Sequence, residues 1–315
     1  MNGQPDVSWP RLARQVIPRA GIEKARALLE AELDSLRRDY FRGVDEKTFR
    51  EKAIFPDSRW LFILQHRVLA RGILSHLLTD SVVALAKSCL PGEIGFFNVA
   101  FVRVAYPEST SDGREKLADL TFSPLHRDLY GEAQTITFWT PLMDVNEDTG
   151  GLLWTNDPEL SEMTSRDISP EQFHRRGRPS DRYLRLLAER TQGAVCSAGD
   201  AYYFPRTLWH GSSYCKTRPR MTVDFRLVDV ESAERSDPRT NRLVRPLSEF
   251  PRCIERRAFI ELVGLRDFAF LRRFPASAAR ACGARIAARL ASAGAGSQSS
   301  AAPTQEPPWM NPDRP

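Results

Sequence analysis

The stretch Pro91-Gly92-Glu93-Ile94-Gly95-Phe96-Phe97-Asn98-Val99-Ala100-Phe101-Val102-Arg103-Val104-Ala105-Tyr106 marks the point where the sequence changes from helical to strand-like periodicity. Before it, apolar residues recur at intervals of three and four, notably in segments 20–42 and 57–78, which predicts helices. After the Pro-Gly pair, β-branched and aromatic residues dominate, as is typical of strands. The stretch therefore separates an N-terminal helical support, residues 1–92, from a β domain.

Further strand-like runs follow, separated by turns rich in Gly, Pro, Asn and Asp. They are 134–140, 151–155, 194–197, 201–204 and 221–230. Several short strands after a helical lead predict an antiparallel sandwich or barrel, here over residues 93–230. A polar, Arg-rich insertion at 156–192 is expected to close over a site as a lid.

The pattern beyond residue 230 predicts a basic helical segment, 231–292, and then a disordered tail, 293–315, rich in Gly, Ser, Ala and Pro. The chain of 315 residues has a formal charge of +5. Residues 1–230 carry 31 basic and 31 acidic side chains, whereas residues 231–315 carry 14 basic and 9 acidic ones. The excess positive charge therefore lies C-terminal to the β domain. Because 39 of the 45 basic residues are Arg, we interpret the bias as genomic composition more than as a sign of anionic partners.

Several classes of protein are excluded by composition. A hydrophobic share of 42% is too high for a disordered chain. No apolar run approaches the ~20 residues of a membrane-spanning helix, and the first residues lack the features of a secretory signal. Five scattered cysteines without CxxC spacing predict reduced thiols in a cytoplasmic protein. The oligomeric state cannot be predicted from these features.

The residues that carry chemistry begin at Ser123-Pro124-Leu125-His126-Arg127-Asp128. Because side chains alternate along a strand, a His-x-Asp pair at a strand end directs two metal ligands the same way. A second histidine, His210, follows a Gly-Asp turn and a strand, and precedes two small residues, Gly211 and Ser212. Together, His126, Asp128 and His210 supply two imidazoles and one carboxylate. This combination is the facial triad that leaves open coordination positions on Fe(II). The alternative is that His126 and His210 are hydrogen-bonded core residues.

The segment 220–226 alternates polar and apolar residues, so that Arg220, Thr222, Asp224 and Arg226 share one face of a predicted strand. An Arg ten residues after His210 can hold the far carboxylate of a dicarboxylate chelated at the metal. Alternatively, Arg220 is a structural ion-pair partner. Arg226 has two predicted roles of equal weight: it binds an anionic or hydroxyl-rich substrate, or it pairs with Asp224 or another carboxylate.

The sequence resembles the phytanoyl-CoA dioxygenase-like branch of the Fe(II)/2-oxoglutarate oxygenases over roughly residues 75–230. The matching motifs occur in the order of that family. They are His126-x-Asp128, Thr137-Phe138-Trp139-Thr140-Pro141-Leu142, the Thr149-Gly150-Gly151-Leu152 turn, Gly199-Asp200, His210-Gly211-Ser212 and Arg220.

The resemblance implies a mainly β fold with flanking helices, a double-stranded β-helix (a jelly-roll, cupin-like barrel). It implies Fe(II) held by His126, Asp128 and His210, with O2 as oxidant. The cosubstrate 2-oxoglutarate would be bound by Arg220, Ser212, Thr222 and Trp139. The expected reaction is hydroxylation, desaturation or cyclisation of a small-molecule metabolite, in natural-product or sugar-derived antibiotic biosynthesis. Arg226 is the predicted substrate-binding residue.

Two other functions stay open. An AlkB-type oxidative demethylase of nucleic acid is suggested by Arg220-x-Thr-x-Asp-Phe-Arg226 and by the basic C-terminal segment. The Thr149-Gly150-Gly151-Leu152 turn and the lack of aromatic residues interleaved with Lys and Arg argue against it. The third function is a catalytically inactive barrel that acts as a binding module.

Overall fold

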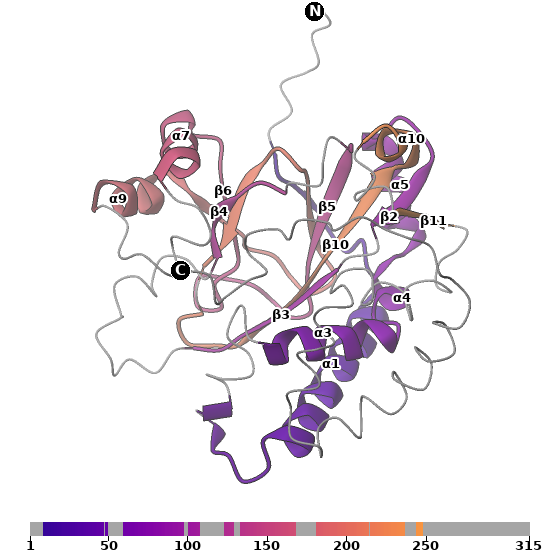
Figure 1. Ribbon diagram of the computed structural model, residues 1–315, viewed down its shortest axis with the longest axis vertical. Helices are drawn as coiled ribbons and strands as arrows, with labels where there is room; N and C mark the ends of the chain where they lie inside the picture. The colour runs from indigo at the N-terminus through magenta and orange to yellow at the C-terminus, as the bar shows by residue number, and fades with distance from the viewer. Residues whose placement is uncertain are drawn as a thin grey trace, which may run out of the picture. The chain divides into compact units, whose positions relative to one another are not determined.

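The computed structural model describes residues 9–46, 48–49, 59–97, 100–107, 123–128, 133–167, 181–213, 215–236 and 244–247 (Figure 1). Within these ranges an N-terminal helical region precedes two antiparallel β-sheets. None of the described helices is both long enough and apolar enough to span a bilayer.

The N-terminal helices follow the predicted periodicity. They are α1 (Arg19–Tyr40), α3 (Arg59–Ala70), α4 (Leu74–Leu77) and α5 (Asp80–Cys89). Thr79 is the N-cap of α5, and its hydroxyl accepts a hydrogen bond from the backbone amide of Val82 at 3.3 Å. One face of α1 is buried, including Ile22, Leu29 and Leu36. The helices predicted from segments 20–42 and 57–78 are therefore present.

The larger sheet has seven strands, and its central strand is the longest in the described structure. In spatial order they are β1 (Arg11–Ala13), β8 (Ala201–Pro205), β5 (Thr135–Pro141), β10 (Arg220–Asp229), β2 (Ile94–Phe97) and β11 (Val244–Pro246), with β3 (Phe101–Ala105) also paired to β10. All of these pairings are antiparallel. Strand β10 thus lies beside β2, β3 and β5, and β5 carries the predicted site residue Trp139.

The smaller sheet has four strands and faces the larger one. Its order is β4 (Ser123–His126), β9 (Trp209–Ser212), β6 (Leu152–Thr155) and β7 (Gln192–Gly193). Side chains of the two sheets meet in one buried cluster, where Trp139 and Tyr202 of the larger sheet join Trp154 of the smaller one. Two facing antiparallel sheets with flanking helices confirm the predicted mainly β, jelly-roll fold class.

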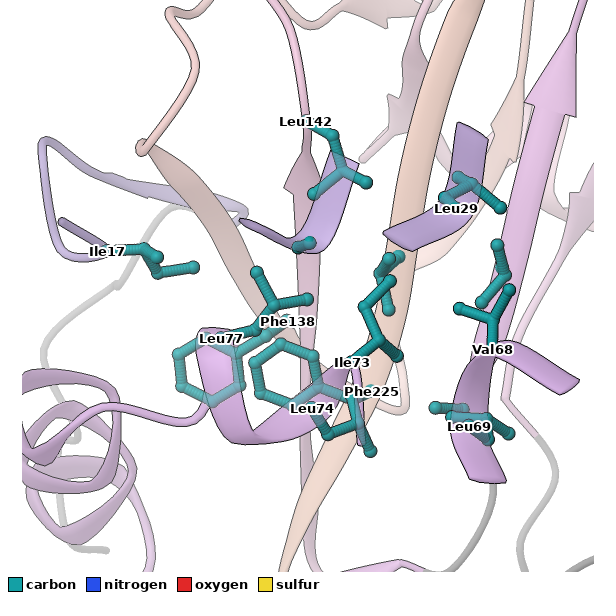
Figure 2. Packing of buried hydrophobic residues seen from close by; sticks show 14 of the residues in the cluster. Ile17, Leu29, Val68, Leu69, Ile73, Leu74, Leu77, Phe138, Leu142 and Phe225 are labelled. Atoms are coloured by element: carbon teal, nitrogen blue, oxygen red, sulfur yellow. The ribbon is translucent and has the colours of Figure 1, made fainter. Parts of the chain in front are cut away.

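The outer face of the larger sheet forms the main hydrophobic core with the N-terminal helices (Figure 2). Alternate residues of β10, including Val223 and Phe225, point into this core, and Phe138 of β5 stacks on Phe225 with ring centroids 5.4 Å apart. The intervening residues of β10 face the smaller sheet. The helices thereby fix which face of β10 is available for a site.

The insertion contributes two described helices, α7 (Pro158–Asp167) and α9 (Asp181–Arg190). They pack together in a separate cluster with Leu125 of β4. The part at 168–180 lies outside the described residues, so the lid stays a prediction. After β10, the short helix α10 (Val230–Glu234) is described, whereas most of the predicted segment 231–292 and the whole tail 293–315 are not.

Residues 244–246, predicted to lie in the helical segment 231–292, form β11 instead, because they pair with β2. Two further predictions of secondary structure are wrong. Residues 11–13, predicted to lie in a helical region, form β1, because Asp200 accepts a hydrogen bond from the Gln15 amide at 2.8 Å and holds this segment beside β8. Residues 194–197, predicted as a strand, make only an isolated bridge between Cys196 and Val145. Both outcomes depend on contacts between distant segments, which local periodicity does not report.

Removing one aromatic ring from this stacked core should lower the stability of the fold. Phe138 has no exposed surface and also stacks on Tyr203, with ring centroids 5.8 Å apart. Phe138→Ala should lower the free energy of unfolding by about 3–5 kcal/mol, because it removes buried surface and leaves a cavity. Denaturant titration followed by circular dichroism measures this loss. Val195→Ser, at a side chain that is 60% exposed, should change it by less than about 0.5 kcal/mol.

Candidate metal centre

His126 and His210 lie side by side on the adjacent strands β4 and β9. Their ring centroids are 4.5 Å apart. Asp128 follows the end of β4, and its Oδ1 lies 4.0 Å from Nε2 of His210. One potential ligand atom from each of the three residues lies within 4.8 Å of the others, and no second cluster of this kind occurs among the described residues. The structure therefore brings the three predicted metal ligands together.

The tautomer of His210 is fixed by the backbone. Its Nδ1 lies 3.0 Å from the carbonyl oxygen of Leu208, which can only accept a hydrogen bond, so Nδ1 is the protonated nitrogen. Nε2 consequently carries the lone pair, and this is the atom that faces Asp128. The Phe204 ring, with its centroid 4.7 Å away, packs on the imidazole. Hydrogen bonds of this type orient metal-binding histidines in other proteins.

Asp128 is buried, and its carboxylate is held by two neighbouring strands of the larger sheet. Arg226 of β10 donates from Nε to Oδ2 at 3.0 Å and from Nη2 to Oδ1 at 2.9 Å. Thr137 of β5 donates its hydroxyl to Oδ2 at 2.8 Å. Because Oδ2 accepts two bonds and Oδ1 only one of these, Oδ1 is the oxygen better placed to bind a metal ion.

The electrostatics set the protonation states that a metal ion requires. Burial by itself would raise the pKa of Asp128, but the adjacent Arg226 guanidinium and the neighbouring imidazoles hold this pKa well below its usual range. Burial, reinforced by His126, lowers the pKa of His210 to about 3. An ionised carboxylate and a neutral imidazole are the forms that bind metals. The donor set therefore fits a divalent ion of intermediate hardness such as Fe(II).

A cavity between the two sheets adjoins these ligands. The smaller sheet contributes His126, Leu152 and His210–Ser212, and the larger sheet contributes Arg103, Thr137, Trp139, Phe204, Asp224 and Arg226. A ligand in this cavity would contact both histidines and the polar face of β10. Polar groups from both sheets therefore line the cavity beside the two histidines.

The four residues predicted to bind 2-oxoglutarate fall into two groups. Ser212 and Trp139 line the cavity. Arg220 and Thr222 are each 1% exposed and are not among the described side chains that line it. Arg220 instead donates from Nη1 to the carbonyl oxygens of Thr149 and Ser213, at 3.1 and 3.0 Å.

Arg226, the predicted substrate-binding residue, forms the two-pronged ion pair with Asp128. Its side chain is 3% exposed. Of its two predicted roles, the structure favours pairing with a carboxylate, although the partner is Asp128 and not Asp224. Asp224 is paired with Arg103 of β3 instead.

Two residues beside the candidate ligands, Thr137 and Arg103, were not predicted as site residues. Thr137 is two residues before Trp139, so the period-two alternation of β5 could have placed it on the inner face. Arg103 lies on β3, opposite Thr222 of β10, and no motif marks it. Its position depends on how these two strands pair.

No protein-family model and no curated protein sequence matches the chain. Solved structures do resemble it in part. One of them is the non-heme α-ketoglutarate-dependent epimerase SnoN from nogalamycin biosynthesis. Its complex with Fe3+, α-ketoglutarate and nogalamycin RO is 15% identical to this chain with a TM-score of 0.42, and the match covers 70% of this chain and 79% of SnoN.

Two further similar structures come from Streptomyces. AviO1 from Streptomyces viridochromogenes is 14% identical with a TM-score of 0.42, covering 70% of this chain and 89% of its own. HygX from Streptomyces hygroscopicus, with iron bound, is 15% identical with a TM-score of 0.42, covering 71% and 83%. A likeness of this size does not by itself establish the fold or the chemistry of this chain, which rest on the residues described above.

Proposed function

We propose that the protein is a non-haem Fe(II)- and 2-oxoglutarate-dependent dioxygenase of the phytanoyl-CoA dioxygenase-like branch. The observation that carries this proposal is the grouping of His126, Asp128 and His210 beside one cavity, with Asp128 ionised by Arg226. Two histidines and one carboxylate leave coordination positions for a chelating 2-oxo acid and for O2. When bound, Fe(II) would supply the activation of O2 that removes hydrogen from a substrate.

The residues of the chain have separate tasks in this proposal. Leu208 orients His210, and Thr137 with Arg226 orients Asp128. Ser212 donates a hydrogen bond to the cosubstrate, and Trp139 forms one wall of its pocket. Arg220 and Thr222 lie on the inner face of β10, behind the cavity wall. From there the positive charge of Arg220 attracts the far carboxylate of the cosubstrate.

The proposed substrate is a small-molecule metabolite of natural-product or sugar-derived antibiotic biosynthesis, oxidised in the cytoplasm by hydroxylation, desaturation or cyclisation. The presence of Asp128 disfavours halogenation, because halogenases of this type give up the carboxylate ligand to make room for halide. We also propose that the insertion 156–192 closes over the site as a lid, because exclusion of water protects reactive intermediates.

Succinate formation tests the function. Purified protein with Fe(II), ascorbate and 2-oxoglutarate is screened over candidate metabolites and methylated oligonucleotides, and succinate is quantified. Turnover stimulated by a small molecule supports the proposal. Stimulation by methylated oligonucleotides alone would instead indicate the AlkB-type function. Failure of the metal-loaded protein to bind 2-oxoglutarate would indicate a binding module without this chemistry.

A further inference from the structure

Two of the three candidate ligands depend on a strand that is weakly fixed by backbone pairing. His126 ends β4 and Asp128 follows it. Strand β4 has four residues and pairs only with β9 among the described strands. Its register with β9 is irregular between Ser123 and His126, and such an irregularity disrupts the hydrogen-bond ladder locally. Contacts other than strand pairing must therefore hold this segment in place.

The residues beside the histidines point to the other face of the smaller sheet. His126 lines the cavity, whereas its neighbour Leu125 is 1% exposed in a cluster with α7 and α9. Trp209, which precedes His210 on β9, packs against the same cluster. In Figure 1, α7 and α9 lie beside β4 and β6, on the side away from β5 and β10. Each histidine thus adjoins a residue that is anchored behind the sheet.

Arg127 and Trp209 connect the two histidine-bearing segments on this outer face. His126 is opposite His210 in an antiparallel pair. Arg127 and Trp209 are the next residues of the two segments to meet. The guanidinium carbon of Arg127 lies 4.7 Å from the centroid of the Trp209 ring, within the range of a cation–π interaction. Trp209 also lies between His210 and Leu208, whose carbonyl holds Nδ1 of that histidine, so a displaced Trp209 would move both.

The two helices behind the sheet are fastened to each other and to β6. Inside the cluster, the hydroxyl of Tyr183 on α9 lies 3.2 Å from Oγ1 of Thr164 on α7. Thr155, at the end of β6, donates to the carbonyl oxygen of Arg190 at 2.9 Å. Arg190 in turn pairs with Asp157 at 3.2 Å. The cluster behind the smaller sheet is therefore held both at its centre and at its base.

We propose that Leu125, Arg127 and Trp209 are positioning residues, which set the affinity of the metal centre from the outer face of the smaller sheet. This role rests on the proposed function, because it requires that the three candidate ligands hold a metal ion. It gives α7 and α9 a task that is separate from the proposed lid. The described side chains that line the cavity do not include these three residues, so they act through the ligands and not on a substrate.

Calorimetric titration of the purified protein with Co(II) tests this role. Trp209→Ala and Leu125→Ala should each raise the Kd of Co(II) by about 10- to 100-fold, as is typical when a group that orients a metal ligand is lost. Trp209→Phe keeps an aromatic ring against the helices and should recover most of the affinity. Arg127→Gln, at an exposed position, should raise the Kd by about 2- to 5-fold, and Arg127→Lys should restore it.

Two control variants separate positioning from a general loss of stability. Leu29→Ala removes an equally buried leucine from the main core, so it should destabilise the fold and leave the Kd of Co(II) unchanged. Arg185→Gln, at an exposed position of α9, should also leave the Kd unchanged. Because Arg127 is exposed, its variants stay informative even if Leu125→Ala does not fold.

The outcomes distinguish this role from the proposed function. Wild-type Co(II) affinity in folded Trp209→Ala or Leu125→Ala would overturn the role and leave the proposed function intact. An equal loss of affinity in Leu29→Ala would also overturn it, because the effect would then follow stability alone. If the wild-type protein does not bind Co(II), the proposed function fails and the role of these residues fails with it.

Discussion

His210→Ala should abolish metal binding and all turnover of 2-oxoglutarate. His210 presents Nε2 towards Asp128 because Leu208 holds Nδ1, and no other His, Cys, Asp or Glu in the described structure is grouped with these ligands. Loss of an outer-shell partner of a metal ligand already costs about 10- to 100-fold in affinity, so loss of a ligand should cost more than about 100-fold. Titration with Co(II) and a succinate assay measure the two losses.

The control for this variant is His76→Ala. His76 lies at the end of α4, outside the site, and the same substitution there should leave Co(II) affinity and succinate formation unchanged. Circular dichroism of His210→Ala checks that the fold is retained, because its imidazole packs on Phe204. Full metal affinity or full turnover in His210→Ala would show that the triad is assigned incorrectly.

Arg226→Gln should both destabilise the protein and weaken its metal site. The variant leaves Asp128 buried without its ion-pair partner, and breaking a buried pair from one side costs about 3–5 kcal/mol. Chemical denaturation of the metal-free protein measures the loss. Because Arg226 fixes both carboxylate oxygens, Co(II) affinity should fall by about 10- to 100-fold.

Two further variants separate charge from geometry. Arg226→Lys keeps the charge but cannot bind both oxygens in one plane, so stability should recover more than metal affinity. The double variant Arg226→Met with Asp128→Leu removes both charges and should be more stable than Arg226→Gln, although it cannot hold a metal ion. Wild-type stability in Arg226→Gln would contradict the role of this ion pair. Since neither readout requires a substrate, the prediction stands apart from substrate identity.

Local patterns in the sequence were sufficient for the helices, most strands and the order of the motifs. Helical spacing in segments 20–42 and 57–78, the cap at Thr79 and the alternation of β10 all depend on residues a few positions apart. Relations between residues this close in the chain can be identified from the sequence alone. The three proposed metal ligands were predicted by residue type and motif, and the structure places them together.

The tertiary structure alone decided how those residues are supported. The pairing of Arg226 with Asp128 joins positions 98 residues apart, and that of Arg103 with Asp224 joins positions 121 apart. The register of neighbouring strands determines which side chains meet, and a shift by one residue would turn each to the other face. The sequence by itself therefore determined the three candidate metal ligands, but not Thr137 or Arg103 beside them. Only the packing of the sheets decided that Arg226 binds the carboxylate of Asp128, that Arg220 is buried and that Arg103 lines the cavity.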